Sequence, residues 1–267
     1  MNLDRITLIV SIVISFVFVI LGGFIVTGEV VRGLQSDKLK SQVVTSVERI
    51  EDGHTNAIEK MKSTRESVLK SGTKKQKENV EKVLDYIPKE TFIEDAYTAY
   101  ATPHIPMTTM KDVLNFSLSD GQTTKMYEDV IDNYGTGTIE LPTINTRVPI
   151  IEGTTDDHLN VGVTTTEYGE TIGRGDYVLT GLNIGYNGLF FSSLPNIKHG
   201  ERVTINTYVN GERIQADYYV KKKIVTDKND TSYINKNGLR RLVLVTNKDI
   251  KDDSKKLVVI CLLYTSD

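Results

Sequence analysis

The sequence predicts a mainly β domain, a closed eight-stranded β-barrel with short helices, preceded by an N-terminal transmembrane helix and a helical stalk. Three observations carry this prediction. From residue 135 onward, about eight short β-rich segments follow one another at regular spacing, a pattern typical of a barrel. A polar stretch with helical periodicity precedes them, and an uncharged apolar run opens the chain.

The apolar run extends from Ile6 to Gly28, contains no charged residue and is dense in Ile, Val, Phe and Leu. At ~1.5 Å per residue, a helix of this length spans a bilayer core of about 30 Å. A cleavable signal peptide is the alternative, but its apolar core is shorter, roughly 7–15 residues. We therefore expect residues 1–28 to be a retained anchor. The count of basic residues on the two sides of this run weakly favours an N-terminus outside the cell.

Residues 29–104 are predicted to form a helical stalk or spacer. Between Leu39 and Lys70 a poor heptad seam recurs at alternating spacings of four and three, with His54 and Thr64 as interruptions. Its apolar members are Val43, Val47, Ile50, Ala57, Met61 and Val68. Two interpretations stay open: a coiled coil that makes the protein a homodimer, or an amphipathic helix lying on its own domain. A second helix is expected from Lys74 to Ile87, before Pro88.

Residues 105–267 are predicted to be the barrel domain. The expected strands are residues 137–141, 146–151, 176–181, 202–209, 212–224, 241–246 and 257–260. Asn210-Gly211 predicts a tight hairpin between two of them. We expect a helix from Met107 to Phe116 to pack across the barrel, and a helical turn from Asp156 to Val161. The almost wholly polar stretch from Asn247 to Lys256 is predicted to be a loop.

Composition excludes several classes of function. The net charge of −3 gives no basic excess, so nucleic acid is not an expected partner. A single Cys excludes an internal disulfide and a cysteine metal cluster, and the four His lack the spacing of zinc ligands. Asp156 and Asp157 with Glu152 are interpreted as a solvated acidic loop. We expect no metal and no cofactor.

The order and spacing of several segments resemble the sortases, the membrane-anchored cysteine transpeptidases of Gram-positive bacteria, and most closely class A. The resemblance runs from roughly Thr109 to the C-terminus. Its segments are Gly137–Ile144, Pro149–Thr155, Leu159–Thr165, Gly173–Gly181, Leu189–Leu194, Leu242–Asn247 and Lys256–Ile260. It implies a sortase-type barrel outside the cell membrane, held by a single-pass anchor whose N-terminus lies inside, against the weak charge count.

The resemblance also implies a chemistry. Sortases cut a sorting signal, commonly Leu-Pro-x-Thr-Gly, after the Thr, and pass the acyl group to an amine of the cell wall or of a pilin precursor. The reaction needs a thiolate that attacks the Thr carbonyl, a histidine that protonates the leaving amine, and an arginine that stabilises the oxyanion or holds the substrate.

Here the resemblance puts Leu182 at the histidine position, Asn247 at the cysteine position and Lys256 at the arginine position. A carboxamide is a very poor nucleophile, and Leu182 cannot carry a proton, so general acid catalysis worth ~10²–10⁴-fold is lost. Lys256 keeps a positive charge but lacks the planar fork of arginine. The residues implied for the substrate groove are Thr180, Gly181, Val245 and Thr246.

A rescue of the chemistry by other residues is not expected. Cys261 is the only thiol, and its place in the last predicted strand favours a packed small hydrophobe. His158 and His199 are interpreted as surface residues, and His104 as a loop residue beside Pro103.

The leading hypothesis is therefore a membrane-anchored sortase-like protein with a degenerate centre, which retains a peptide-binding or scaffold role. One alternative is an active class A sortase. The other is a structural protein whose function is dimerisation through the stalk.

Overall fold

The computed structural model describes residues 30–77, 105–119, 122–166, 170–173, 175–209, 211–234 and 240–264. The chain divides into two compact units, Met1–Leu39 and Lys40–Asp267. Of the first unit, residues 30–39 are described, and they are helical. The predicted anchor at residues 1–28 and His104 lie outside the described residues, as does most of the helix expected from Lys74 to Ile87. No helix in the described ranges is long and apolar enough to cross a membrane.

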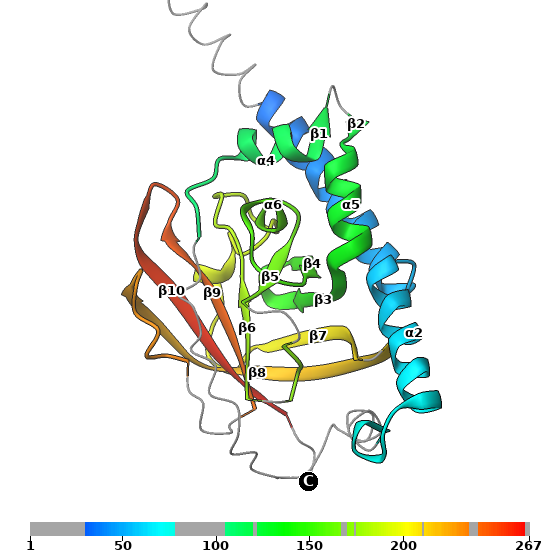
Figure 1. The fold of residues 1–267 in the computed structure, drawn as a ribbon. Helices are drawn as coiled ribbons and strands as arrows, with labels where there is room; N and C mark the ends of the chain where they lie inside the picture. Colours follow the sequence, from blue (N-terminus) through cyan, green and yellow to red (C-terminus); the bar gives the residue numbers. More distant parts are fainter. Residues whose placement is uncertain are drawn as a thin grey trace, which may run out of the picture. The chain divides into compact units, whose positions relative to one another are not determined.

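The second unit contains a closed barrel of eight strands among the described residues (Figure 1). The strands are β3 (Gly135–Leu141), β4 (Thr146–Ile151), β5 (Val163–Thr165), β6 (Asp176–Thr180), β7 (Arg202–Val209), β8 (Glu212–Asp227), β9 (Arg241–Asp249) and β10 (Asp252–Leu263). Around the barrel the order is β10-β8-β7-β3-β4-β5-β6-β9. Neighbours are antiparallel except for the pairs β4–β5 and β6–β9. The predicted mainly β class and closed barrel are confirmed.

The polar stretch from Asn247 to Lys256 is mostly strand, so the predicted loop is wrong. Strand β9 continues to Asp249 and β10 begins at Asp252. The hairpin tip carries exposed residues, among them Lys248 and Ile250. Because neither face of the hairpin tip, residues 248–255, is buried, the alternation that identifies a strand in sequence is missing there.

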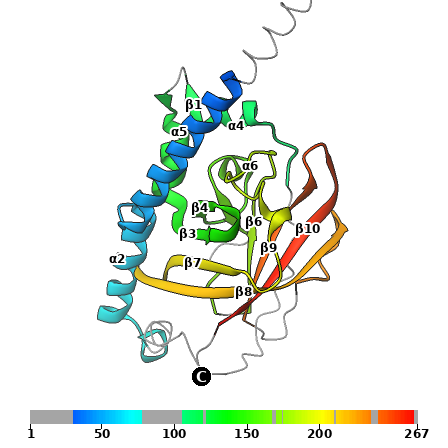
Figure 2. The same ribbon diagram turned by 180° about the vertical axis from the view of Figure 1, so that it is seen from behind.

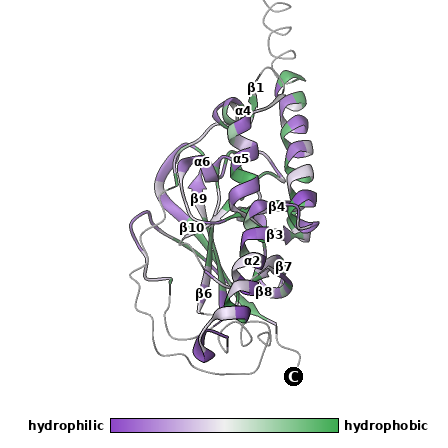
Figure 3. Ribbon diagram, turned by 45° about the vertical axis from the view of Figure 1, so that its right-hand side comes forward, coloured by the Kyte–Doolittle hydropathy of each residue, from purple (hydrophilic) through white to green (hydrophobic). Residues whose placement is uncertain are grey.

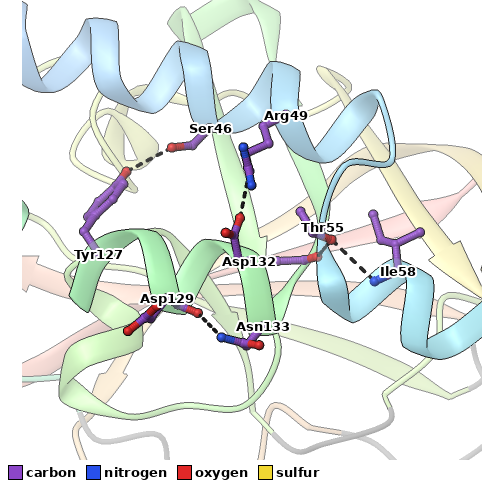
Figure 4. A network of polar contacts seen from close by, with 9 residues as sticks. Ser46, Arg49, Thr55, Ile58, Tyr127, Asp129, Asp132 and Asn133 are labelled. Atoms are coloured by element: carbon purple, nitrogen blue, oxygen red, sulfur yellow. Dashed lines mark hydrogen bonds and ion pairs between the residues drawn. The ribbon is translucent and has the colours of Figure 1, made fainter. Parts of the chain in front are cut away.

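The helical stretch expected from Leu39 to Lys70 is present as two helices rather than one continuous helix. A first helix ends at Glu51, and α2 (Asn56–Ser71) begins after a turn. Gly53 supplies a left-handed conformation with φ of +74°, which glycine adopts without steric cost. Thr55 then caps α2 by accepting a hydrogen bond from the backbone N–H of Ile58, and its hydroxyl donates to the Gly135 carbonyl (Figure 4).

The helix at residues 40–51, with α2 and α5 (Lys125–Tyr134), lies along one side of the barrel (Figures 1 and 2). Their apolar faces join the barrel in one buried cluster, made of Ile50, Ile58, Tyr127, Val130, Ile131, Ile151 and Val161. The seam residues Val43 and Val47 are also buried. This packing agrees with the second interpretation, an amphipathic helix lying on its own domain.

Polar contacts tie the same helices together at their edges. The Ser46 and Tyr127 hydroxyls are 3.3 Å apart, and Arg49 donates to Asp132 at 2.7 Å (Figure 4). Hydrophilic and hydrophobic residues alternate along these helices (Figure 3), as expected of elements with one buried face. Helix α5 was not predicted, although Thr124 in its N-cap position is a start signal.

Helix α4 (Met110–Ser117) starts later than the predicted Met107, because Thr109 and Asp112 form a capping box at its N-terminus. It contacts α5 and the short hairpin that follows rather than packing across the barrel as expected. That hairpin consists of β1 (Leu118–Ser119) and β2 (Gln122–Thr123). The remaining short elements are α6 (Asp156–Leu159), η1 (Pro142–Ile144) and η2 (Leu194–Asn196).

Candidate active site at the ends of β6, β9 and β10

Asn247 and Lys256 lie directly opposite each other on the antiparallel strands β9 and β10. Only 3% of Asn247 and 2% of Lys256 is exposed. Strand β6 runs parallel to β9, with Thr180 opposite Val245, so the chain that leaves β6 passes beside the end of β9. The fold thus gathers at one end of the barrel the chain segments that carry all three positions singled out in the sequence.

Two hydrogen bonds fix the chain after β6 against β9. The Gly181 N–H donates to the Val245 carbonyl at 3.0 Å, and the Thr246 hydroxyl donates to the Gly181 carbonyl at 2.8 Å. A Cβ atom at Gly181 would lie 2.7 Å from the ring of Phe191, so only glycine fits this close approach. Leu182 follows with its side chain buried in the core, where it offers the site no polar group.

The four residues predicted to line a groove, Thr180, Gly181, Val245 and Thr246, are all buried. The Thr246 hydroxyl is used by the bond to Gly181, whereas the Thr180 Oγ1 is buried without a hydrogen-bond partner in the described part of the chain. These residues form a packed layer beneath the site rather than its exposed wall.

Asn247 is held from two directions. Its backbone carbonyl accepts a hydrogen bond from Asn183 Nδ2 at 3.2 Å. Its side-chain Nδ2 donates to the carbonyl of Ile105, also at 3.2 Å, across 142 residues of sequence. The other side-chain atom, Oδ1, is buried and has no hydrogen-bond partner among the described residues. The carboxamide therefore donates to the chain that precedes α4 and keeps one buried acceptor.

Sequence reasoning missed both Asn183 and Ile105. Asn183 directly follows the leucine at the predicted histidine position, so its neighbourhood was identified but its role was not. Ile105 had no local signal, because a contact over 142 residues is created by the fold. The trace of residues 105–109 runs from α4 toward the ends of β9 and β10 in both ribbon views (Figures 1 and 2).

The electrostatics of Lys256 follow from its burial. Loss of hydration, with a smaller contribution from the charge of Lys228, lowers its pKa from 10.5 to about 8. At pH 7 the amine is still mostly protonated, so it can donate to a carbonyl oxygen. In mildly alkaline solution it loses its charge.

Cys261 lies farther along β10 than Lys256, away from the site. On β10 it pairs with Leu242 of β9 and Val220 of β8, five residues beyond Lys256, or about 16 Å along a strand. Burial raises the pKa of its thiol to about 12. Because the thiolate is the nucleophilic form, this cysteine is inert at neutral pH, in agreement with its interpretation as a packed hydrophobe.

The histidines are placed differently from one another. His199 is exposed, as expected. His158 is buried, so its prediction as a surface residue is wrong. Its Nδ1 lies 2.7 Å from the Gly153 carbonyl oxygen, and its ring packs against the tilted ring of Tyr134, with 4.4 Å between the ring centroids. The contact to Gly153, five residues earlier, explains why a polar ring is tolerated inside.

Asp156 and Asp157 are exposed in the first turn of α6, after the cap residue Thr155. In the described ranges, no group of three or more His, Cys, Asp or Glu is arranged to hold a metal ion.

The sequence of this chain is similar to known proteins of one family. A family model described as the Sortase domain matches residues 139–264. Sortase A of Bacillus anthracis is 28% identical over 188 residues, which cover 70% of this chain and 79% of that protein. Sortase A of Listeria monocytogenes is 23% identical over 124 residues, which cover 46% of this chain and 54% of the relative.

The crystal structure of Listeria monocytogenes sortase A aligns with a TM-score of 0.45 and 21% identity, covering 49% of this chain and 88% of that one. The stretch matched by the family model includes β4 to β10 and all three positions at the barrel end. The chain carries a sortase domain over residues 139–264 and belongs to the sortase family.

Proposed function

We propose that this protein is a class A-like member of the sortase family whose catalytic centre is degenerate, and that it binds sorting signals of the Leu-Pro-x-Thr-Gly type without cleaving them. The observation that carries the proposal is the buried pair of Asn247 and Lys256, which stands where the family resemblance implies a thiol and a guanidinium. The relatives named sortase A support the class.

The chemistry of the site supports binding without turnover. Acyl transfer requires a nucleophile that forms a covalent intermediate, and neither the Asn247 carboxamide nor Leu182 supplies one. The only thiol, Cys261, has a raised pKa and is buried between β8 and β9.

The same residues suit an extended peptide. A peptide backbone offers a carbonyl acceptor and an N–H donor at each residue. Asn247 offers one donor and one acceptor, and the ammonium of Lys256 adds donors for a carbonyl. The partners expected on this basis are the sorting signals of cell-wall or pilin precursors.

A fluorogenic Leu-Pro-x-Thr-Gly peptide tests the proposal on the full chain in detergent micelles. We expect the peptide to bind without cleavage. The triple variant Leu182→His, Asn247→Cys, Lys256→Arg is expected to gain cleavage, and the double variant without Leu182→His serves as its control, since it lacks the proton carrier. Turnover by the unaltered protein that disappears in Cys261→Ala would instead favour the alternative, an active class A sortase.

We further propose that residues 1–28 anchor the chain in the cell membrane as a single pass, with the globular domain outside. The uncharged run from Ile6 to Gly28 and the family membership support this orientation. Protease added to intact cells should then digest the barrel domain, whereas protection of that domain until the cells are lysed would reverse the orientation.

A further inference from the structure

Strand β8 is longer than its neighbour β7, and over its second half it is paired on one side only. Residues 212–219 pair with β7, and residues 218–227 pair with β10. Beyond Val220, which still bonds to the chain before β7, no strand of the described part of the chain pairs with the side of β8 that faces away from β10. We call residues 221–227 the free edge. In both ribbon views this part, coloured orange, runs beside β10 at the margin of the barrel (Figures 1 and 2).

We propose that the free edge binds an extended acidic segment of a partner protein, which adds to the barrel as a further strand. An unpaired strand edge presents backbone N–H and C=O groups with which another chain can pair. The pairing of residues 222–227 with β10 is regular, because the shift in register lies before them, at Lys221. Within the described ranges, residues 222–226 form no backbone–backbone hydrogen bond beyond this pairing. Pairing at this edge is independent of the proposed function.

The free edge begins with three consecutive lysines, Lys221, Lys222 and Lys223, all of them exposed. The ion pairs of the described residues include none of the three. Lys223 Nζ donates to the backbone carbonyls of Pro195 and Ile197 at 2.7 and 3.1 Å, so its position is fixed by the chain beside it. The edge therefore presents positive charge that no carboxylate of the described chain neutralises through an ion pair.

The charge of the edge selects the kind of strand that can pair with it. Lysines on an exposed edge discourage pairing with other chains, because like charges directly opposite each other are destabilising, whereas opposite charges are favourable. A second copy of the free edge would bring three more lysines and one acid, Asp227, which already pairs with Lys255 at 2.5 Å. A strand rich in Asp and Glu removes this repulsion, so the edge fits an acidic segment better than a second copy.

Apolar β-branched residues follow the lysines along the edge. Val225 is 51% exposed and Ile224 is half-buried. An added strand would cover part of both side chains, and this burial would add to the main-chain hydrogen bonds. Thr226 lies opposite Lys256 on β10, so the added strand would reach the same end of the barrel as the pair of Asn247 and Lys256. The expected partner segment combines β-branched residues with a run of acids.

Fluorescence polarisation with fluorescein-labelled Ser-Val-Thr-Val-Asp-Glu-Glu-Ser tests the proposal on the full chain in detergent micelles. Paired antiparallel to the free edge, this peptide places its three acids opposite the three lysines. We expect it to bind, and we expect the double variant Lys221→Glu, Lys222→Glu to raise its Kd about ten-fold or more. The double variant Lys60→Glu, Lys75→Glu changes the net charge equally at exposed helical positions and should leave the Kd unchanged.

N-methylated peptides distinguish an added strand from a basic patch that attracts any polyanion, and they require no variant. Methyl groups on alternate backbone nitrogens remove the N–H groups along one edge of the peptide only. Of two peptides methylated on the two alternating sets of residues, one should bind the unaltered protein and the other should not. Equal Kd values for both peptides, or an unchanged Kd in Lys221→Glu, Lys222→Glu, would overturn the added strand.

Absence of binding by the unmethylated peptide would overturn it as well. A dimer of the unaltered protein that the same double variant dissociates would then assign the free edge to a second copy of this chain.

Discussion

Asn247 and Lys256 face each other across β9 and β10, each almost fully buried. An amide and an amine at this spacing provide hydrogen-bond donors and an acceptor, and neither side chain carries a thiol. The burial of Lys256 affects its ionisation, and this can be measured through the stability of the protein.

Lys256 should make stability depend on pH. Burial lowers its folded-state pKa from 10.5 to about 8, so between these values the unfolded chain binds more protons than the folded one. The free energy of unfolding therefore rises with pH in this window, by a total on the order of 3 kcal/mol. Urea unfolding between roughly pH 7.5 and 9.5 should show the rise, and Lys256→Met should abolish it.

Near pH 10, the upper end of this pH range, the slope of stability against pH reports on more than Lys256. Burial raises the pKa of Tyr177 and Tyr218, so near pH 10 these side chains lower the stability as the pH rises. The difference between the unaltered protein and Lys256→Met isolates the lysine. Equal slopes for the two proteins would show that Lys256 is not buried as described.

Gly181→Ala should destabilise the barrel. The new methyl group would lie 2.7 Å from the Phe191 ring and 2.9 Å from Val163 Cγ1, and overpacking of this kind costs about 1–3 kcal/mol. Gly33 provides the matched control, because a methyl group added there would have no atom within 4 Å. The melting temperature should fall for Gly181→Ala, and it should stay unchanged or rise for Gly33→Ala.

Breaking the buried ion pair of Arg241 with Asp176 should lower the free energy of unfolding far more than breaking an exposed pair. Arg241 Nε donates to Asp176 at 2.7 Å, a second contact joins the same groups, and the Tyr233 carbonyl accepts a further bond. Asp176→Ala leaves a buried guanidinium without its counter-charge, at a cost of about 3–5 kcal/mol.

The exposed pair of Lys228 and Asp253 is the comparison for that prediction. Asp253→Ala should cost less than about 1 kcal/mol, because solvent screens the charges. Chemical denaturation of both variants measures the contrast. Similar losses in the two would mean that solvent reaches the Arg241 pair.

Cys261 should resist thiol reagents in the folded protein. Its side chain is fully buried and its pKa is raised to about 12, so labelling by a disulfide reagent at pH 7.5 should require unfolding. In denaturant the thiol should react at once. Rapid labelling of the folded chain would reopen the possibility of a thiol-based mechanism.

The sequence was sufficient for the barrel because the buried strands have continuous or alternating apolar patterns. Strand β7 was predicted at its observed bounds, and the turn after it was identified from Asn210-Gly211, of which Gly211 lies among the described residues. The tip of the hairpin of β9 and β10, residues 248–255, was missed because its residues are exposed or half-buried. The break between two helices at Gly53 was likewise not predicted, because the heptad pattern continues across it in the sequence.

The candidate site could be predicted only in part. Family resemblance identified Leu182, Asn247 and Lys256, and the fold brings their chain segments to one barrel end. The bond between Asn247 and Ile105 could not be predicted, since no periodicity or motif spacing links residues so far apart in sequence. Contacts of this kind are determined by the tertiary structure alone.

Strand β10 pairs on one side with β8 and on the other with β9, although it is the final strand of the barrel to be synthesised. Until it emerges from the ribosome, the nascent sheet has two open edges, and such edges are prone to pair with other chains. Early termination before Asp252 would therefore release an aggregation-prone fragment rather than a smaller working domain.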